Sequence, residues 1–157
     1  MSKGTRATKM LEQAGIAFTT ATYDYDPNAQ SIGLQAAEAL GEAPDRVLKT
    51  LMALVDRKPV CVIVPSDHEV SLKKLAAAFG GKSAEMMKPA DAERISGYKV
   101  GGISPFGQMR KLPIAIEEQA LGHEAVYVNG GQRGLQVRLR PSDIVTAVGA
   151  IAAPLVA

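Results

Sequence analysis

One lysine stands inside a strongly apolar run of the sequence, VLKTLMALV (47–55), in which Lys49 is the only charged residue. Alternate positions are apolar on both faces of this run, a pattern typical of a strand that is covered on both sides. An ammonium group there needs an anionic or carbonyl partner, or it loses its proton, which makes Lys49 a candidate site residue. Alternatively, Lys49 lies near a strand end and extends its charged group to solvent. The next residue, Thr50, either donates a hydrogen bond on the opposite face or simply suits a strand.

Two glycine-containing runs could form a site with their backbone, GYKVGGISPFGQMRKLP (97–113) and NGGQRG (129–134). The adjacent Gly101 and Gly102 allow a close backbone approach, and Pro105 favours an extended conformation at Ser104. Exposed N–H groups in such a loop could bind a carbonyl oxygen or a phosphate. The second run has a similarly permissive backbone, although Asn-Gly-Gly is also usual in a hairpin turn.

Apolar spacing and capping residues predict the elements that position these runs. Helices are expected at 5–15, 31–41, 71–81, 89–96 and 141–152, the second and third capped by Ser31 and Ser71. Strands are expected at 16–23, 46–55, 58–65, 98–103, 113–118, 125–131 and 135–140, with a hairpin turn at 56–58. The order lacks a regular βαβ rhythm, so we expect an α+β fold with a mixed sheet, in one domain over residues 1–157.

Composition is that of a globular protein, with 46% hydrophobic and 22% charged residues. No apolar stretch is long enough to cross a bilayer and the N-terminus has no apolar signal segment, so we expect a cytoplasmic protein without a membrane partner. Residues 46–111 hold twelve Lys or Arg and six Asp or Glu, which leaves six of the 18 basic and ten of the 16 acidic residues elsewhere. This basic middle segment is either a surface for a phosphate-rich partner or a solvated lysine surface.

Several kinds of catalytic site are excluded because their motifs are missing. The sequence has no phosphate loop of the GxxxxGK[ST] type, no GxGxxG, no HExxH and no GxSxG. His68 and His123 are far apart and lack metal-ligand spacing, and His68 is either a loop residue or a helper at a site. The single cysteine, Cys61, lies in the apolar run PVCVIVP and is expected in the core. We therefore expect no metal and no cofactor.

Four segments together resemble the YbaK family of aminoacyl-tRNA deacylases, which is related to the editing domain of bacterial prolyl-tRNA synthetase. They are ATYDYDP (21–27), VLKTL (47–51), GYKVGGISPFGQMRKLP (97–113) and VYVNGGQRGLQV (126–137). The resemblance implies a curved, barrel-like mixed β-sheet with flanking helices. It also implies hydrolytic removal of a wrongly attached amino acid from tRNA, in this family most characteristically cysteine from Cys-tRNA(Pro).

The resemblance also assigns candidate site residues. Lys49 falls on the family's lysine, and Gly101 and Pro105 fall on the ends of its GxxxP motif, so Lys49 and Gly101 are the predicted catalytic residues. The predicted substrate-binding residues are Tyr23, Ile32, Thr50, Gly102, Ile103, Ser104, Pro105, Asn129, Gly130 and Gly131. Ile32 stands where relatives can have an aromatic residue. Gln136 stands where some relatives have an acid, so a role that needs that carboxylate is in doubt here.

The implied chemistry needs no dedicated nucleophile, because an aminoacyl ester is already activated and the site has mainly to position it. In this interpretation Lys49 anchors the terminal adenosine or its phosphate and the N–H groups of residues 101–103 bind the carbonyl. The thiol of cysteine then attacks its own carbonyl. Two alternatives remain, an Ala-tRNA(Pro) deacylase that uses water and a non-catalytic tRNA-binding paralogue. The expected partners are aminoacyl-tRNA and, transiently, prolyl-tRNA synthetase, with a monomer as the default state.

Overall fold

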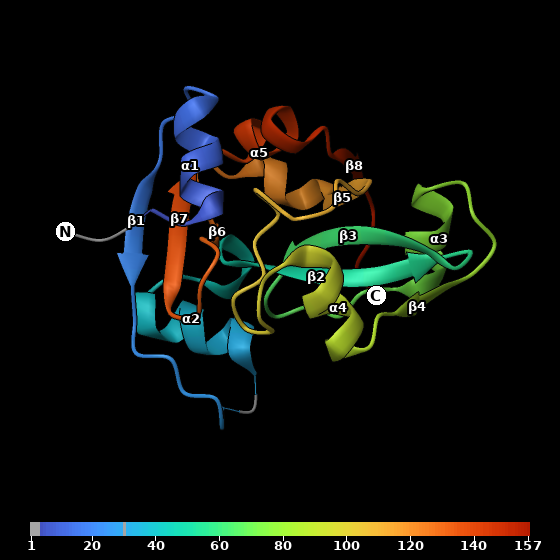
Figure 1. The fold of residues 1–157 in the computed structure, drawn as a ribbon, viewed down its shortest axis with the longest axis horizontal. Helices are drawn as coiled ribbons and strands as arrows, with labels where there is room; N and C mark the ends of the chain where they lie inside the picture. The colour runs from blue at the N-terminus through green and yellow to red at the C-terminus, as the bar shows by residue number, and fades with distance from the viewer. Residues whose placement is uncertain (1–3, 30) are drawn as a thin grey trace.

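The computed structural model describes residues 4–29 and 31–157 and contains helices and two separate sheets (Figure 1). The α-helices are α1 (Arg6–Gln13), α2 (Ile32–Leu40), α3 (Leu72–Ala78), α4 (Pro89–Ser96) and α5 (Pro141–Val148), with 3-10 turns η1 (Pro44–Arg46) and η2 (Glu118–Gly122). The strands are β1 (Thr19–Thr22), β2 (Leu48–Val55), β3 (Lys58–Pro65), β4 (Ala84–Met86), β5 (Ile114–Glu117), β6 (Val126–Asn129), β7 (Leu135–Leu139) and β8 (Ile151–Ala153).

The larger sheet has the strand order β4-β2-β3-β5-β8 and the smaller one the order β1-β7-β6. In the larger sheet β3, β5 and β8 run parallel to each other, whereas β2 is antiparallel to both of its neighbours. One bridge, between Val47 and Tyr127, links the two sheets. The predicted α+β class is confirmed, but the described strands do not close into a barrel, so the barrel-like part of the prediction is not confirmed.

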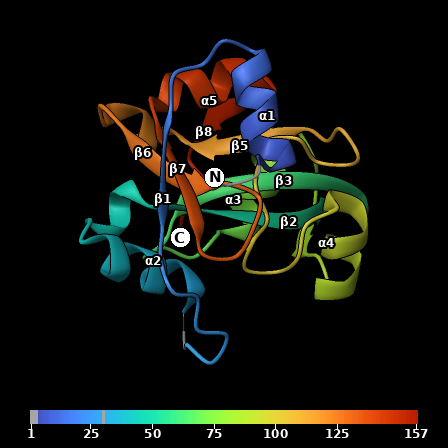
Figure 2. The same cartoon turned by 60° about the vertical axis from the view of Figure 1, so that its left-hand side comes forward.

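Helices lie on two sides of the sheets. In both views α1 and α5 lie on one side and α2 and α4 lie on the opposite side (Figures 1 and 2). The β2–β3 hairpin runs from the small sheet towards α3 and β4 (Figure 1). No helix among the described residues has the length and apolar character needed to span a membrane.

The predicted hairpin of β2 and β3 is confirmed. Its turn consists of Asp56 and Arg57, both with positive φ (48° and 68°), which is the conformation that suits the twist of two paired strands. The Asp56 carboxylate accepts hydrogen bonds from the backbone N–H groups of Lys82 (3.0 Å) and Ser83 (3.0 Å). This contact holds the turn against the segment that leads into β4.

Both faces of β2 are buried, as the apolar pattern predicts. On one face Leu48 and Met52 belong to the larger core cluster. On the other face Ala53 and Val55 belong to a second cluster that packs beside α3. Cys61, predicted to be a core residue, is fully buried, and burial raises the pKa of its thiol to about 12, so the thiol is protonated at neutral pH.

Helix ends follow the capping residues. The hydroxyl groups of Ser31 and Ser71 accept hydrogen bonds from the N–H groups three residues further on, as predicted. The helix predicted at 141–152 ends early, at Val148, because Gly149 adopts the left-handed conformation (φ 64°). The three residues that follow Ala150 form β8, which pairs with β5.

The strand predicted at 98–103 is wrong. This segment is a loop, because Gly97 (φ 81°) ends α4 in the left-handed conformation and Gly101 (φ 88°) turns the chain again. Tyr98 is buried instead, and its hydroxyl donates a 2.6 Å hydrogen bond to the carbonyl of Phe106. Strand β4 was not predicted, and the predicted first strand at 16–23 is shorter, at Thr19–Thr22.

Candidate functional site

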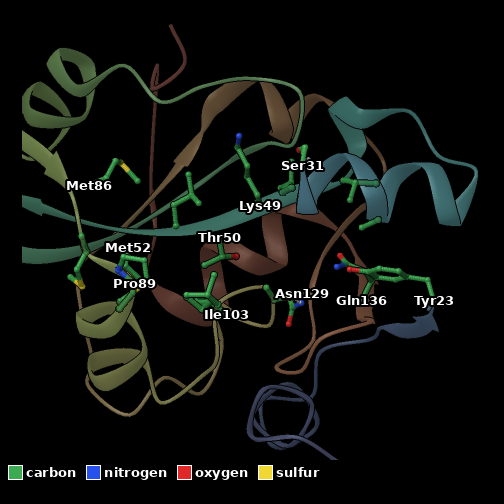
Figure 3. A pocket seen from close by; sticks show the side chains of 18 residues that line it. Tyr23, Ser31, Lys49, Thr50, Met52, Met86, Pro89, Ile103, Asn129 and Gln136 are labelled. Carbon is green, nitrogen blue, oxygen red and sulfur yellow. Dashed lines mark hydrogen bonds between the residues drawn. The ribbon is translucent and has the colours of Figure 1, made fainter. Parts of the chain in front are cut away.

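A cavity of about 350 Å³ lies between β2, α4, the loop around Gly101 and the paired strands β6 and β7 (Figure 3). One end is lined by polar side chains, namely Tyr23, Ser31, Lys49, Thr50, Asn129 and Gln136. The other end is lined by apolar side chains, namely Leu51, Met52, Met86, Met87, Pro89 and Ala92. The cavity can therefore hold a ligand with a polar and an apolar part.

Six of the predicted site residues line this cavity: Tyr23, Lys49, Thr50, Gly101, Ile103 and Asn129. They come from the residue that follows β1, from β2, from the α4–β5 loop and from β6, so the fold brings together residues more than a hundred positions apart. The side chain of Ile32 lies outside the described part of the structure.

The other predicted residues do not line the cavity. Ser104 is fully buried, and its hydroxyl accepts the N–H of Phe106 (3.2 Å), while the neighbouring Pro105 is also buried. Gly130 donates its N–H to the carbonyl of Leu135 (2.9 Å), and Gly131 donates its N–H to Asn129 Oδ1 (2.7 Å). In this structure these residues shape the two loops.

Lys49 lies on β2 with its side chain about 20% exposed. Its Nζ lies 3.8 Å from Oε1 of Glu69, a carboxylate whose own side chain is 90% exposed. Such an exposed ion pair contributes little to stability, which leaves the ammonium group available to an anionic ligand. His68, next to Glu69, does not line the cavity and lies 2.7 Å from the carboxylate of Asp67.

Hydrogen bonds to α4, to the β6–β7 hairpin and within the loop hold the residues around Gly101, among them one from the N–H of Val100 to Glu93 Oε2 (2.9 Å). The carbonyl of Val100 accepts from Arg133 Nε (2.9 Å), and the carbonyl of Gly101 accepts from Asn129 Nδ2 (3.2 Å). The N–H of Gly102 donates to the carbonyl of Lys99 (2.8 Å) and is already used within the protein. Of the three N–H groups that we predicted to bind a carbonyl, those of Gly101 and Ile103 are the ones on which the prediction now depends.

The space beside the two glycines is occupied by protein. A Cβ on Gly101 would overlap the Tyr25 hydroxyl, and a Cβ on Gly102 would lie 2.8 Å from the backbone nitrogen of Arg133. Tyr25 and Arg133 also contact each other, with the guanidinium 5.1 Å from the centre of the ring. The missing side chains therefore allow this loop to pack closely against Tyr25 and the β6–β7 turn.

Gln136 on β7 faces the cavity and is paired in register with Asn129 on β6. The residue is 4% exposed, and its Oε1 has no hydrogen-bond partner among the described residues. Thr50, 8% exposed, has a buried Oγ1 that likewise lacks a partner in the described part of the chain. Burial raises the pKa of the nearby Tyr23 hydroxyl, against the opposing effect of a side-chain hydrogen bond with Gln136.

Sequence reasoning missed the apolar end of the cavity and treated Ser31 only as a helix cap. Met86 reaches this site because β4 pairs with β2, where Met86 stands opposite Ala53. No periodicity in the sequence indicates that pairing. Pro89 was interpreted only as the first residue of a helix, now α4. Gln136 was singled out from the sequence only because some members of the resembled family have an acidic residue at this position.

A model of the aminoacyl-tRNA editing domain matches residues 26–147 of this chain. The chain belongs to the aminoacyl-tRNA editing domain family. This editing domain is 34% identical over 144 residues to EbsC of Enterococcus faecalis, which is named as a candidate Cys-tRNA(Pro)/Cys-tRNA(Cys) deacylase, and the match covers 90% of this chain and 87% of the relative. It is 24% identical over 148 residues to the multifunctional Ser/Thr-tRNA deacylase ProXp-y of Escherichia coli, covering 91% and 89% of the two chains.

The fold of this editing domain is also known from solved structures. A crystal structure described as a candidate trans-editing enzyme for prolyl-tRNA synthetase superposes with a TM-score of 0.82, at 23% identity, over 99% of both chains. At that identity the likeness shows the fold alone.

The described residues that line the cavity of this editing domain can bind and orient a ligand. Lys49 is the only charged residue among the described residues that line it, and the other polar groups are hydroxyls, amides and backbone. Among the described residues, no three of His, Cys, Asp and Glu are grouped so that they could hold a metal ion. The site can bind an anion at Lys49 and hydrogen-bond a neutral polar group at its centre.

Proposed function

We propose that this editing domain cleaves the ester between a misattached amino acid and its tRNA, and that its substrate is cysteine on tRNA(Pro). The observation that carries this proposal is the cavity lined by Lys49, Thr50 and the Gly101 loop. Membership of the aminoacyl-tRNA editing domain family supports the reaction class, and the similarity to EbsC supports cysteine as the amino acid.

The size and polarity of the cavity suit the end of a charged tRNA. A volume of about 350 Å³ is near the lower limit of ordinary ligand pockets and accommodates a small aminoacyl group with part of the terminal nucleoside. Lys49 binds the terminal adenosine or its phosphate, because its ammonium group attracts the negative charge of a phosphate. The N–H groups of Gly101 and Ile103 bind the ester carbonyl.

The cavity then needs no nucleophile of its own. The sulfur of the bound cysteine attacks the carbonyl carbon of its own ester, so a C–S bond forms and the C–O bond to the ribose breaks. The thiol proton passes to the departing ribose oxygen, which leaves tRNA with a free hydroxyl and a small cyclic thioester of cysteine. Holding the thiol and the carbonyl close together supplies most of the rate increase in such an intramolecular reaction.

The partner that presents the substrate is part of the proposal. The basic middle segment, residues 46–111, receives the acceptor stem of tRNA, with an affinity that falls as salt concentration rises. Selection of tRNA(Pro) comes from a transient complex with prolyl-tRNA synthetase.

The deciding experiment measures loss of the ester from Cys-tRNA(Pro), Ala-tRNA(Pro) and Ser-tRNA(Pro) with purified protein. We expect rapid loss of cysteine and much slower loss of alanine, because alanine has no thiol to attack the carbonyl. Preferential loss of alanine would favour a water-dependent Ala-tRNA(Pro) deacylase over our proposal. Tight tRNA binding without loss of any ester would favour the non-catalytic paralogue.

A further inference from the structure

Two buried oxygen atoms at the polar end of the cavity lack hydrogen-bond partners within the described residues, Thr50 Oγ1 and Gln136 Oε1. Leaving a buried polar atom unpaired costs free energy, and most such atoms in folded proteins are paired. The Gln136 side chain lies beside that of Tyr23 (Figure 3), and its Oε1 has no partner in the described part of the chain. A ligand that brings hydrogen-bond donors to this end of the cavity would satisfy both oxygens.

Gln136 lies beside Asn129, the residue that holds the loop proposed to bind the ester carbonyl. Asn129 stands directly opposite Gln136 in the β6–β7 pair, and side chains at such positions are neighbours. Asn129 in turn donates its Nδ2 hydrogen to the carbonyl of Gly101 (3.2 Å). Thr50 approaches the same region from β2, and Figure 3 shows it between Ile103 and Lys49 on the side that faces Asn129. The two oxygens are therefore near the position proposed for the ester.

An aminoacyl ester carries its strongest donor on the carbon next to that carbonyl, where an α-ammonium group offers three N–H bonds. We infer that Gln136 Oε1 and Thr50 Oγ1 accept hydrogen bonds from the α-ammonium group of the bound aminoacyl ester. This inference rests on the proposed function and names the part of the substrate that the site recognises, whichever amino acid is attached.

The charges around the two oxygens suit an ammonium group. The Lys49 ammonium, which would repel it, points to the other side of β2 from Thr50 in Figure 3. Both acceptors are neutral, so recognition of the amine does not depend on the protonation of a carboxylate. A hydrogen bond between a neutral acceptor and a charged donor is stronger than one between two neutral groups.

The test compares two esters of tRNA that differ only in this group, the aminoacyl ester and the 2-hydroxyacyl ester with the same side chain. The measured quantity is the ratio of their kcat/KM values in wild type, Gln136→Met and Thr50→Val, so intrinsic differences in ester reactivity cancel between proteins. We expect the preference for the amine to fall about tenfold or more in each variant, because a hydrogen bond to a charged group is lost.

Gln108→Met is the matched control. Gln108 also has a buried Oε1 without a partner among the described residues, but it does not line the cavity. Its ratio should equal that of wild type. The melting temperature of each variant shows whether it is folded, and if Gln136→Met does not fold, Thr50→Val decides the test.

An unchanged ratio in folded Gln136→Met and Thr50→Val would overturn the inference. So would an equal loss of activity on both esters, because the two oxygens would then bind another donor, such as a ribose hydroxyl, or act structurally. In both cases ester cleavage by wild type would leave the proposed function intact. Failure of wild type to cleave any aminoacyl ester would overturn the proposed function, and this inference with it.

Discussion

At the scale of single residues, Lys49 has the clearest place in the proposed reaction. It is the only charged group among the described residues around the cavity, and its ion pair with Glu69 is long and exposed. An ammonium group of this kind is held in position by the strand while it stays free to bind an anion. We therefore expect Lys49 to contribute to substrate binding more than to stability of the fold.

Replacing Lys49 with alanine should lower kcat/KM for Cys-tRNA(Pro) by about tenfold to a hundredfold, the range expected for loss of a hydrogen bond to a charged group. The measurement is ester loss under single-turnover conditions. Lys9→Ala removes an exposed lysine of α1 and should leave the rate unchanged. Activity of Lys49→Ala equal to that of wild type would remove Lys49 from the mechanism.

At the scale of elements, the α4–β5 loop depends on the β6–β7 turn. Asn129 and Arg133 bind the carbonyls of Gly101 and Val100, and the backbone of the turn packs closely against Gly102. A neighbouring hairpin therefore helps to position the proposed carbonyl-binding groups. A small displacement of this loop would misplace the carbonyl relative to its attacking group.

Gly102→Ala tests this dependence. The added methyl group would lie 2.8 Å from the backbone nitrogen of Arg133, and because backbone cannot rotate away, the loop has to move. We expect kcat/KM to fall at least about tenfold, as displaced catalytic groups do, in a protein that still folds. The control is Gly122→Ala, where the added methyl group meets nothing within 4 Å. Equal activity of both variants with wild type would show that the position of the loop is unimportant.

At the scale of the whole molecule, one buried carboxylate joins the end of β5 to the distant segment around Leu155. Glu117, 1% exposed at the end of β5, accepts the N–H groups of Leu155 (2.8 Å), Val156 (3.1 Å) and Gln119 (3.0 Å). The carbonyl of Leu155 in turn accepts a hydrogen bond from the N–H of Ser71, which caps α3. Burial alone would raise the pKa of Glu117, but the backbone donors, together with the nearby Lys74, outweigh it and lower the pKa.

Because the pKa of Glu117 is lowered by folding, its contribution to stability is complete above the ordinary value of about 4.5 and is lost as the pH falls through the lower folded value. Glu117→Gln should reduce the free energy of unfolding by about 1 to 3 kcal/mol at pH 7. The difference from wild type should narrow as the pH falls below about 4.5, measured by urea denaturation at several pH values. The exposed neighbour in Glu118→Gln should show little change, and a pH-independent difference for Glu117→Gln would contradict the assigned role.

Several features of the molecule could be read from local patterns. The alternating apolar residues of β2 and β3 predicted a hairpin buried on both faces, and Lys49 was recognisable because a charge in such a strand requires an explanation. The caps Ser31 and Ser71 marked helix starts, since a hydroxyl group before a helix binds its free N–H groups. In contrast, the apolar residues around Gly101 suggested a strand at 98–103, which the left-handed glycines prevent.

By itself, the sequence determined the elements with strong local signals, the family resemblance and most of the residues on the polar side of the cavity. Its first glycine-containing run supplied Gly101 and Ile103 to the cavity but not Ser104 or Pro105, which are buried. Only the tertiary structure placed Met86 beside β2 and Gln136 beside Asn129, and left two buried oxygens unpaired there. The physical reason is that capping and apolar alternation depend on neighbours in the chain, whereas a cavity and the satisfaction of its hydrogen bonds depend on strands that meet only after folding.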